Sequence, residues 1–184
     1  IIPNLCSGNG SKDEVVRRFR GTELQTYFTR LYSSRLKVVH KTQYIELIPM
    51  VVKGKVKEVL MKISSDEGKV LEVANKLNLT HLLDRDVGVL SGGELQRLAI
   101  AAAILRGGDV YIFDEPTTHL DITERLRVAR VISELTSGNR YVLIIDHDLA
   151  VLDYLPDLLV ILYGTHAAYG IHNRIQVPQT SIDA

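Results

Sequence analysis

The sequence predicts an α/β fold built around a parallel β-sheet, and three observations lead to this prediction. Two short apolar runs, Val110–Phe113 and Tyr141–Ile145, have the length and composition of buried strands. The first run ends in two carboxylates, Asp114 and Glu115, and open parallel sheets bind ligands at the edge where their strands end. Helical patterns alternate with the runs, and this order is typical of a doubly wound sheet.

The N-terminal part of the chain is predicted to be a loop followed by a helix–loop–helix. Residues 1–12 are rich in Pro, Asn and Gly, which favour loops. From Asp13 onward the apolar residues are spaced for helix faces and Gly21 is a break, so the two helices should lie at about residues 13–37. Aromatic side chains are interleaved with a basic cluster in this segment. The basic residues are Arg17, Arg18, Arg20, Arg30, Arg35 and Lys37.

A short strand, a helical region and a packed helix are predicted next. Val38-Val39 is the strand, and a helical region with Lys-rich faces extends from about Ile45 to Leu79. Ser91 and Glu94 form a Ser-x-x-Glu capping box, which opens a helix from Gly92 to Arg106. The apolar residues of this helix fall on one stripe, so we expect it to pack on one side.

The second half of the chain alternates strands and helices. After the strand at residues 109–113, a helix begins that Asp121 caps. Tyr141–Ile145 is the next strand, a short helix begins at Asp148, and Leu158–Tyr163 is a further β-rich run. We expect both β-rich runs to belong to the same parallel sheet.

The composition is that of a cytosolic globular protein. The 184 residues suit one domain, and 46% hydrophobic residues suffice for a core. Lys plus Arg and Asp plus Glu number 22 each, so any RNA contact has to be local. The single cysteine, Cys6, excludes a disulfide framework and a Cys-rich metal site within these residues, and it favours a reducing compartment. The apolar runs fall short of the ~18 residues of a membrane span, and the N-terminus lacks a signal-peptide pattern.

Four segments in a fixed order resemble those of the ATP-binding-cassette (ABC) ATPases. Leu90–Arg97 precedes Val110–Pro116, and Thr117–Asp121 and Ile144–Asp148 follow in the family's order. Taken alone, a Ser-x-x-Glu box usually marks only a helix start, and Asp-Glu-Pro can be an ordinary polar turn. The occurrence of all four segments in this order is what indicates a cassette. The resemblance implies a partial P-loop NTPase with a parallel sheet, a helical subdomain and a helix–loop–helix insertion.

More specifically, the chain resembles the first nucleotide-binding domain of the class E ABC ATPases, the ribosome-recycling factors also called RNase L inhibitor. Phe19–Phe28 is similar to the insertion of that group, and the Tyr-Gly pairs at residues 163–164 and 169–170 are similar to its tail. Transporter cassettes lack both features. The chain departs from the group pattern at Thr42, where Pro is usual, at residues 117–121, and at Asp146, where Glu is common. None of these departures removes a catalytic group.

The resemblance also suggests how the chain is organised. Residues 1–42 would hold the N-terminal remainder of the cassette core with the insertion at about 13–37. Residues 43–106 would hold the Gln43 loop and the helical subdomain, ending in the helix that begins with Gly92. Residues 107–172 would complete the core, and residues 173–184 would form a tail toward a hinge.

Four polar side chains at predicted strand ends suit ATP hydrolysis. Hydrolysis needs a metal ion near the phosphates, a group that orients water, and donors for developing charge. Asp114 suits Mg²⁺ held through a water, and Glu115 suits orientation or deprotonation of the attacking water. His147 can donate a hydrogen bond to the γ-phosphate, although a lone histidine at a strand end is more often structural. Gln43 offers an oxygen to Mg²⁺ and an N–H group to water.

A phosphate loop with the sequence Gly-Lys-Ser/Thr is missing from the 184 residues. The sequence therefore looks like a cassette that starts just after that loop, and we expect this chain alone to be inactive. The helix N-terminus at Ser91 can bind a phosphate, and the resemblance implies that this phosphate belongs to an ATP held by a second cassette. The residues expected to face that ATP are Ser91, Gly92, Gly93, Glu94 and Asp121.

By resemblance, the whole protein would be a cytoplasmic ATPase that closes two cassettes on ATP and Mg²⁺ and splits ribosomal subunits. Its expected partners are the second cassette, the small ribosomal subunit with its RNA, and release and initiation factors, with no membrane. Iron–sulfur clusters are expected only in an N-terminal domain that lies outside this sequence. The residues expected to contact the ribosome are Arg17, Arg18, Arg20, Thr22 and Arg30.

Two other interpretations remain open. The chain could be the ATPase subunit of an ABC transporter, in which the helical region after Gln43 docks a membrane partner. It could also be a ribosome-binding remnant that no longer hydrolyses ATP. The basic cluster at 13–37 argues against the first, although on composition alone a solvated helix face explains that cluster equally well. The intact Asp114, Glu115 and His147 argue against the second.

Overall fold

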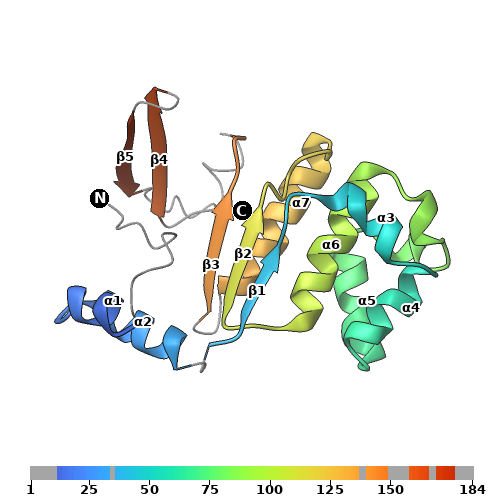
Figure 1. The fold of residues 1–184 in the computed structure, drawn as a ribbon. Coiled ribbons are helices and arrows are strands. Elements are labelled where there is room, and N and C mark those ends of the chain that lie inside the picture. Colours follow the sequence, from blue (N-terminus) through green and yellow to red (C-terminus); the bar gives the residue numbers. More distant parts are fainter. Residues whose placement is uncertain (1–11, 34–35, 137–139, 149–157, 166–168, 177–184) are drawn as a thin grey trace, which may run out of the picture.

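The computed structural model describes residues 12–33, 36–136, 140–148, 158–165 and 169–176 (Figure 1). Helices separate the three strands between residues 38 and 145, as predicted. The 3₁₀ helices are η1 (Ile45–Leu47), η2 (Thr80–Leu82), η3 (Val87–Val89) and η4 (Glu134–Thr136). The α-helices are α1 (Lys12–Arg18), α2 (Glu23–Tyr32), α3 (Ile48–Val51), α4 (Val56–Ile63), α5 (Glu67–Lys76), α6 (Gly92–Arg106) and α7 (Ile122–Ser133). The strands are β1 (Val38–Lys41), β2 (Val110–Asp114), β3 (Tyr141–Ile145), β4 (Leu158–Thr165) and β5 (Tyr169–Gln176).

A three-stranded parallel sheet in the order β1-β2-β3 forms the centre of the fold. Lys41 at the end of β1 pairs with Phe113 of β2. Asp114 at the end of β2 pairs with Ile145 of β3. The three strands therefore end together at one edge of the sheet, the upper edge in Figure 1, and the predicted parallel sheet is confirmed.

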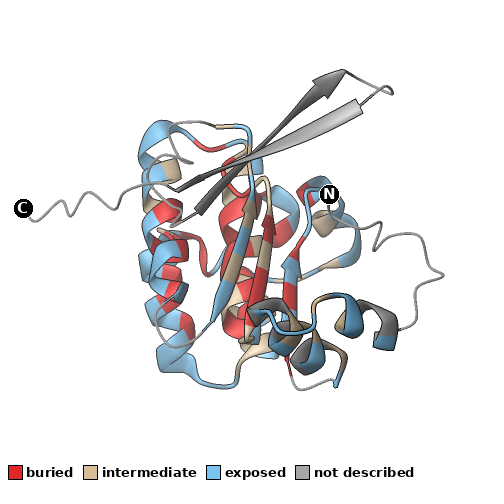
Figure 2. Ribbon diagram, turned by 90° about the vertical axis from the view of Figure 1, so that its left-hand side faces the viewer, coloured by how far each residue is buried: buried red, intermediate tan, exposed pale blue. Residues whose placement is uncertain are grey.

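The two faces of this sheet differ in burial. Tyr111 and Phe113 are 2% and 0% exposed, and they belong to the same apolar core as residues of α6 and α7. On the other face Leu143 and Ile145 are 48% and 59% exposed. Figure 2 shows the buried residues concentrated in the strands and in the helices that pack on them. The covered face thus anchors the sheet, and the other face is open among the described residues.

Helix α6 lies at the middle of the molecule. Its capping box is formed as predicted, and it ends at Gly107, whose φ of 61° lies in the left-handed region that glycine adopts readily. The prediction that α6 packs on one side is wrong. The helix contacts β1 as well as α4 and α5, because it separates the sheet from the helical subdomain. This explains why even Gln96 and Arg97 are buried on it.

The predicted helix–loop–helix is confirmed as α1 and α2. Gly21 between them has a φ of 81°, and its N–H donates to Gln25 Oε1 at 2.8 Å. The Phe19 and Phe28 rings stack at 5.1 Å between centroids, and Phe28 stacks on Tyr32 at 6.0 Å. The aromatic residues of the insertion thus hold its two helices together.

The position of the last β-rich run was predicted wrongly. β4 pairs with β5 in a separate, antiparallel two-stranded sheet and does not extend the parallel sheet. The short connection of residues 166–168 allows this pairing, whereas a parallel pair needs a crossover of a dozen or more residues. β5 continues past residue 172, and the proposed division into four parts stays a prediction. The short helix predicted at Asp148 falls largely on residues 149–157, outside the described residues.

Candidate nucleotide site

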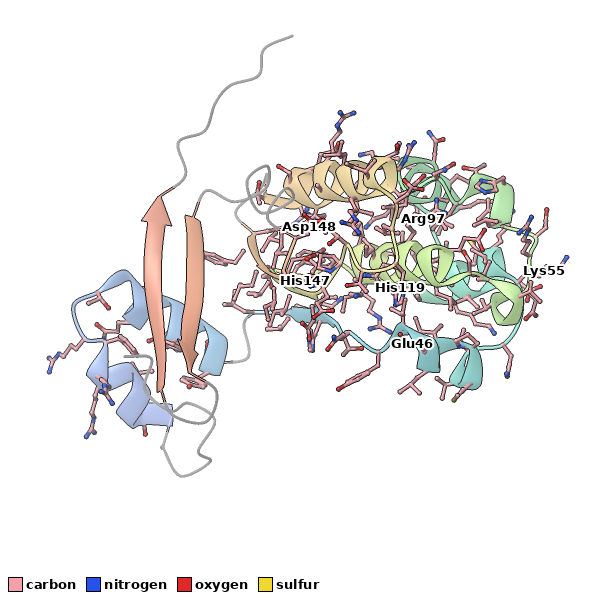
Figure 3. All side chains as sticks on the ribbon, turned by 90° about the horizontal axis from the view of Figure 1, so that it is seen from above. Glu46, Lys55, Arg97, His119, His147 and Asp148 are labelled. Atoms are coloured by element: carbon pink, nitrogen blue, oxygen red, sulfur yellow. The ribbon has the colours of Figure 1, made fainter. Side chains whose placement is uncertain are left out.

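The residues predicted for catalysis come together at the edge where the parallel strands end. Asp114 is the last residue of β2 and Glu115 follows it, and both are partly buried. Gln43 follows β1 and is exposed. His147 follows β3, and its side chain is 75% exposed, with Nδ1 at 4.0 Å from Glu115 Oε1. Figure 3 looks down on this edge and shows His147 beside it.

The backbone of Glu115 has an uncommon conformation that several contacts hold in place. Its φ is 46°, in the left-handed region that non-glycine residues seldom adopt. Its N–H donates to Ile145 O at 2.7 Å, and its carbonyl accepts from Gln96 Nε2. Thr118 Oγ1 donates to its carboxylate at 3.2 Å. Backbone and side chain of Glu115 are therefore both fixed by neighbouring elements.

Asp146 also holds the site together. In the sequence it stood out only as a departure from the family pattern. Its side chain is fully buried. One carboxylate oxygen accepts from the N–H groups of His147 and Asp148, at 2.8 and 3.0 Å. The other accepts from the hydroxyl and the N–H of Thr117, at 2.6 and 3.3 Å. Asp146 therefore ties the turn after β2 to the turn that carries His147.

Lys41 is a further residue that sequence reasoning missed. It is only 4% exposed, and its Nζ donates to Asp114 O at 2.8 Å and to Glu115 O at 3.3 Å. Burial lowers the pKa of Lys41 to about 8, against the opposing effect of the nearby carboxylates of Asp114 and Glu115. The signal available in the sequence was the two-residue period of a strand, which places Lys41 on the same face as the apolar Val39, and the structure shows both residues buried.

The residues predicted to face a second ATP also come together. The Ser91 hydroxyl accepts from Glu94 N at 3.3 Å, and the Glu94 carboxylate accepts from Ser91 N at 2.7 Å. That second bond lowers the pKa of the Glu94 carboxyl. Asp121 caps α7 by accepting from Glu124 N at 2.9 Å. All five predicted residues line one open hollow of about 400 Å³, and four more residues complete its lining. The hollow is lined by Ser91, Gly92, Gly93, Glu94, Arg97, His119, Leu120, Asp121 and Glu124.

Close packing between the start of α6 and the turn before α7 shapes this hollow. A Cβ added at Gly93 would lie 2.8 Å from the carbonyl oxygen of His119, so only glycine fits there. His119 in turn has a φ of 65°, and its Nε2 lies 3.5 Å from Glu46 Oε1. Figure 3 shows His119 and Glu46 facing each other beside α6. The start of α6 and the turn before α7 therefore form one surface.

The donors at the sheet edge suit Mg²⁺ bound with a nucleotide. Asp114 and Gln43 offer oxygen atoms, and Mg²⁺ usually takes one or two protein oxygens and fills its remaining positions with water and phosphate oxygens. In the part of the chain that the structure describes, no three His, Cys, Asp or Glu side chains are grouped as an all-protein metal site. The arrangement fits a cation that arrives with its nucleotide.

The residues expected to contact the ribosome lie elsewhere. Arg17, Arg18, Arg20 and Thr22 are exposed on α1 and the turn after it. The Thr22 hydroxyl donates to Phe19 O at 2.7 Å. Arg30 belongs to α2, and its side chain is outside the described residues. Figure 1 shows α1 and α2 near the edge where the parallel strands begin, at the opposite end of the sheet from Glu115.

Comparison with known proteins decides the family. The sequence model of the ABC transporter family matches residues 4–118, which is more than half of the chain. The chain belongs to the ABC family. Among the described residues of this ABC protein, none of the helices has the length and apolar character needed to cross a membrane.

Curated relatives extend this assignment. The chain is 51% identical over 173 residues to an uncharacterised ABC transporter ATP-binding protein of Methanocaldococcus jannaschii, an alignment that covers 93% of this chain and 28% of the relative. It is 45% identical over 173 residues to the translation initiation factor rli1 of Schizosaccharomyces pombe, covering 92% of this chain and 29% of that factor. The chain thus spans less than a third of the length of these relatives.

Solved structures support the same family assignment and show the fold. An RNase-L inhibitor superimposes with a TM-score of 0.83 and 49% identity, covering 96% of this ABC chain and 34% of the inhibitor. An archaeal ribosome recycling factor in complex with a ribosomal stalk protein gives a TM-score of 0.84 and 50% identity, with 96% and 34% coverage. The predicted cassette fold and the predicted likeness to the RNase L inhibitor group are both confirmed.

Proposed function

We propose that this chain is part of an ATPase that uses ATP binding and hydrolysis to separate ribosomal subunits. The observation that carries the proposal is the set of Asp114, Glu115 and His147 at one sheet edge, in a chain about half identical to a ribosome recycling factor. The likeness to a translation initiation factor supports the same process. On this proposal the protein works in the cytoplasm, with release and initiation factors among its partners.

At the sheet edge, Glu115 orients the attacking water and takes its proton as the water oxygen bonds to the γ-phosphorus. The bond from that phosphorus to the bridging oxygen breaks, which gives ADP and phosphate. His147 donates a hydrogen bond to the γ-phosphate, and its 4.0 Å separation from Glu115 leaves both groups at the same phosphate. Asp114 and Gln43 would hold Mg²⁺, which neutralises phosphate charge when bound. Gln43 also contacts the water, so it can sense whether the γ-phosphate is present.

The hollow at the start of α6 is proposed to contact an ATP held by a second cassette. Free backbone N–H groups at a helix N-terminus bind phosphate, and Gly92 and Gly93 contribute the N–H groups of the first turn of α6 to the lining of this hollow. Ser91 and Asp121 lie on the two sides of this hollow. A single cassette would then use the sheet edge for its own ATP and the hollow for its neighbour's.

The exposed arginines of the insertion are proposed to contact ribosomal RNA. Arg17, Arg18 and Arg20 are all exposed on one short segment. A local patch of this kind neutralises phosphates without a basic protein overall. Thr22 and Arg30 would add contacts from the turn and the second helix. The insertion lies away from the sheet edge, so ribosome binding and catalysis use separate surfaces.

The decisive experiment is Glu115→Gln in the full-length protein that carries this segment. ATP binding should persist because the amide has nearly the shape of the carboxylate, and hydrolysis at this site should fall by about 100-fold or more. Subunit splitting should then stall in a sedimentation assay with repeated turnover. Glu72→Gln, an exposed change on α5, is the matched control and should have no effect.

Other outcomes of this experiment favour the alternatives. Loss of hydrolysis with ribosome splitting unchanged, together with co-purification of the protein with membranes, would favour a transport ATPase. A wild-type protein that binds ribosomes and shows no hydrolysis at this site would favour a remnant without catalysis.

A further inference from the structure

The side of the sheet edge that faces α6 carries a buried cation with no assigned role. Lys41 is the last residue of β1 and is 4% exposed. Its register beside Phe113 places it on the covered face of the sheet, whereas Asp114 is on the opposite face. The Lys41 ammonium group therefore approaches the turn after β2 from behind, on the side away from the nucleotide.

The contacts of Lys41 are with two successive carbonyls of that turn. Nζ lies 2.8 Å from Asp114 O and 3.3 Å from Glu115 O. A charged donor makes a stronger bond than a neutral one, and a lysine has enough protons for both acceptors. The two carbonyls belong to the two residues that carry the carboxylates of the site.

Those carbonyls matter because the direction of the Glu115 side chain depends on its backbone. Its left-handed φ of 46° is unfavourable for a residue with a Cβ and persists only where the surroundings hold it. The N–H of Glu115 is held by Ile145 O. The carbonyl is held by Lys41 and Gln96, so Lys41 supplies the charged part of this support.

We propose that Lys41 is a positioning residue for hydrolysis at this cassette: its ammonium group holds the Asp114 and Glu115 carbonyls and so aims the Glu115 carboxylate at the attacking water. The inference rests on the proposed function of Glu115 and deepens it. Lys41 does not touch the nucleotide, so its loss should change the rate of the chemical step more than the binding of ATP.

The test is Lys41→Met in the full-length protein, compared with Lys41→Arg. Methionine keeps about the length of the lysine side chain and removes its positive charge. The kcat should therefore fall by ~10- to 100-fold, as it does when a catalytic group is slightly misplaced. The KM for ATP should stay within about twofold of the wild-type value. Arginine keeps the charge and the donors, and it should restore most of kcat. A role in packing alone would not give this split between kcat and KM or the rescue by arginine.

Two reference variants make the result unambiguous. Lys53→Met is the matched control, because Lys53 Nζ also donates to a backbone carbonyl, that of Pro49, on an exposed part of the helical subdomain. It should leave kcat unchanged. Glu115→Gln reports on the proposed function itself, and normal hydrolysis in that variant would overturn the proposed function rather than the role of Lys41.

The inference is overturned if Glu115→Gln is slow while folded Lys41→Met keeps a normal kcat. Folding is checked by a thermal melt. If Lys41→Met does not fold, Lys41→Gln takes its place, since glutamine keeps a donor but has no charge and a shorter reach. A normal kcat in that variant likewise overturns the inference, and a reduced kcat with normal KM supports it.

Discussion

Asp146 is the residue whose contacts set the relative position of two turns of the candidate site, the one after β2 and the one that carries His147. A buried carboxylate that accepts four hydrogen bonds is stable only if all its donors stay in place. Asp146→Asn replaces one acceptor oxygen by an N–H₂ group that faces donors. We expect the free energy of unfolding to fall by about 2 kcal/mol, measured by urea denaturation. Asp84→Asn on an exposed site is the control, and equal effects of both changes would contradict this prediction.

Lys41 should give the stability of the chain a specific dependence on pH. Burial lowers its pKa to about 8 from 10.5, so the unfolded state binds more protons between these two pH values. The free energy of unfolding of the wild type, relative to Lys41→Met, should therefore rise as the pH increases from about 8 toward 10.5. Over the whole interval the rise should be about 3 kcal/mol. Denaturant titrations at several pH values measure it, and a flat difference would contradict it.

Motif residues were predictable, but the residues that support them were not. Asp114, Glu115 and His147 each follow an apolar strand, which is visible in the sequence. Lys41 and Asp146 are charged residues whose burial depends on partners far along the chain, Asp114 and Thr117. Periodicity identifies the face of a strand, but it does not identify what a buried charge will contact.

At the scale of elements, the start of α6 is fitted against the turn before α7. Gly93→Ala would place a methyl group 2.8 Å from the carbonyl oxygen of His119, so either α6 or the turn has to move. We expect a loss of ~1–3 kcal/mol in stability and weaker trapping of nucleotide at the opposite site. Gly92→Ala is the matched change, because its nearest contacts are side-chain atoms of the exposed His119, from 3.3 Å, which can turn aside. Equal effects of the two substitutions would contradict the argument.

The elements were predicted where local pattern determines them. Caps and periodicity located α6 and α7 closely, and Gly21 marked the break between α1 and α2. The pairing of β4 was not predictable, since an apolar run carries no information about its partner strand. Neither was the burial of α6 on more than one side, because Arg97 is buried among partners far along the chain, the carbonyls of Leu77 and Asn78 and the carboxylate of Glu124.

At the scale of the whole molecule, the first prediction concerns ATP binding and hydrolysis by the isolated 184-residue chain. It should bind ATP with Mg²⁺ weakly and hydrolyse it negligibly, because no phosphate loop supplies an N–H cradle and a lysine within these residues. Isothermal titration calorimetry and a phosphate-release assay measure both properties. Tight binding with turnover that Glu115→Gln abolishes would show that the loop is dispensable.

The second expectation concerns the basic insertion. Changing Arg17, Arg18 and Arg20 to Glu in the full-length protein should weaken binding to the small ribosomal subunit, because the patch would then repel phosphates. The remaining affinity should depend less steeply on salt than that of the wild type. ATPase activity without ribosomes should stay near normal. Sedimentation with subunits over a range of salt concentrations measures the effect.

The control for this experiment reverses the same amount of charge elsewhere. Lys53, Lys62 and Lys69 are exposed on or beside the helices α3–α5. If their change to Glu weakens subunit binding as much as the arginine variant does, then overall charge, and not the insertion, governs binding. The sequence predicted the cluster itself, since it is local, but whole-chain charge gave no hint of it.

The carbonyl of Glu115 links the sheet edge to the start of α6, where the hollow lies. It accepts from Gln96, which lies only three residues beyond Gly93 on α6. A displacement of the start of α6 at the hollow would therefore shift the Gln96 amide that holds Glu115. Occupancy of one nucleotide site would then alter the rate at the other, and linkage requires that any such effect on affinity be felt equally in both directions. On the proposed function, this one amide side chain would couple the two ATP sites of the cassette.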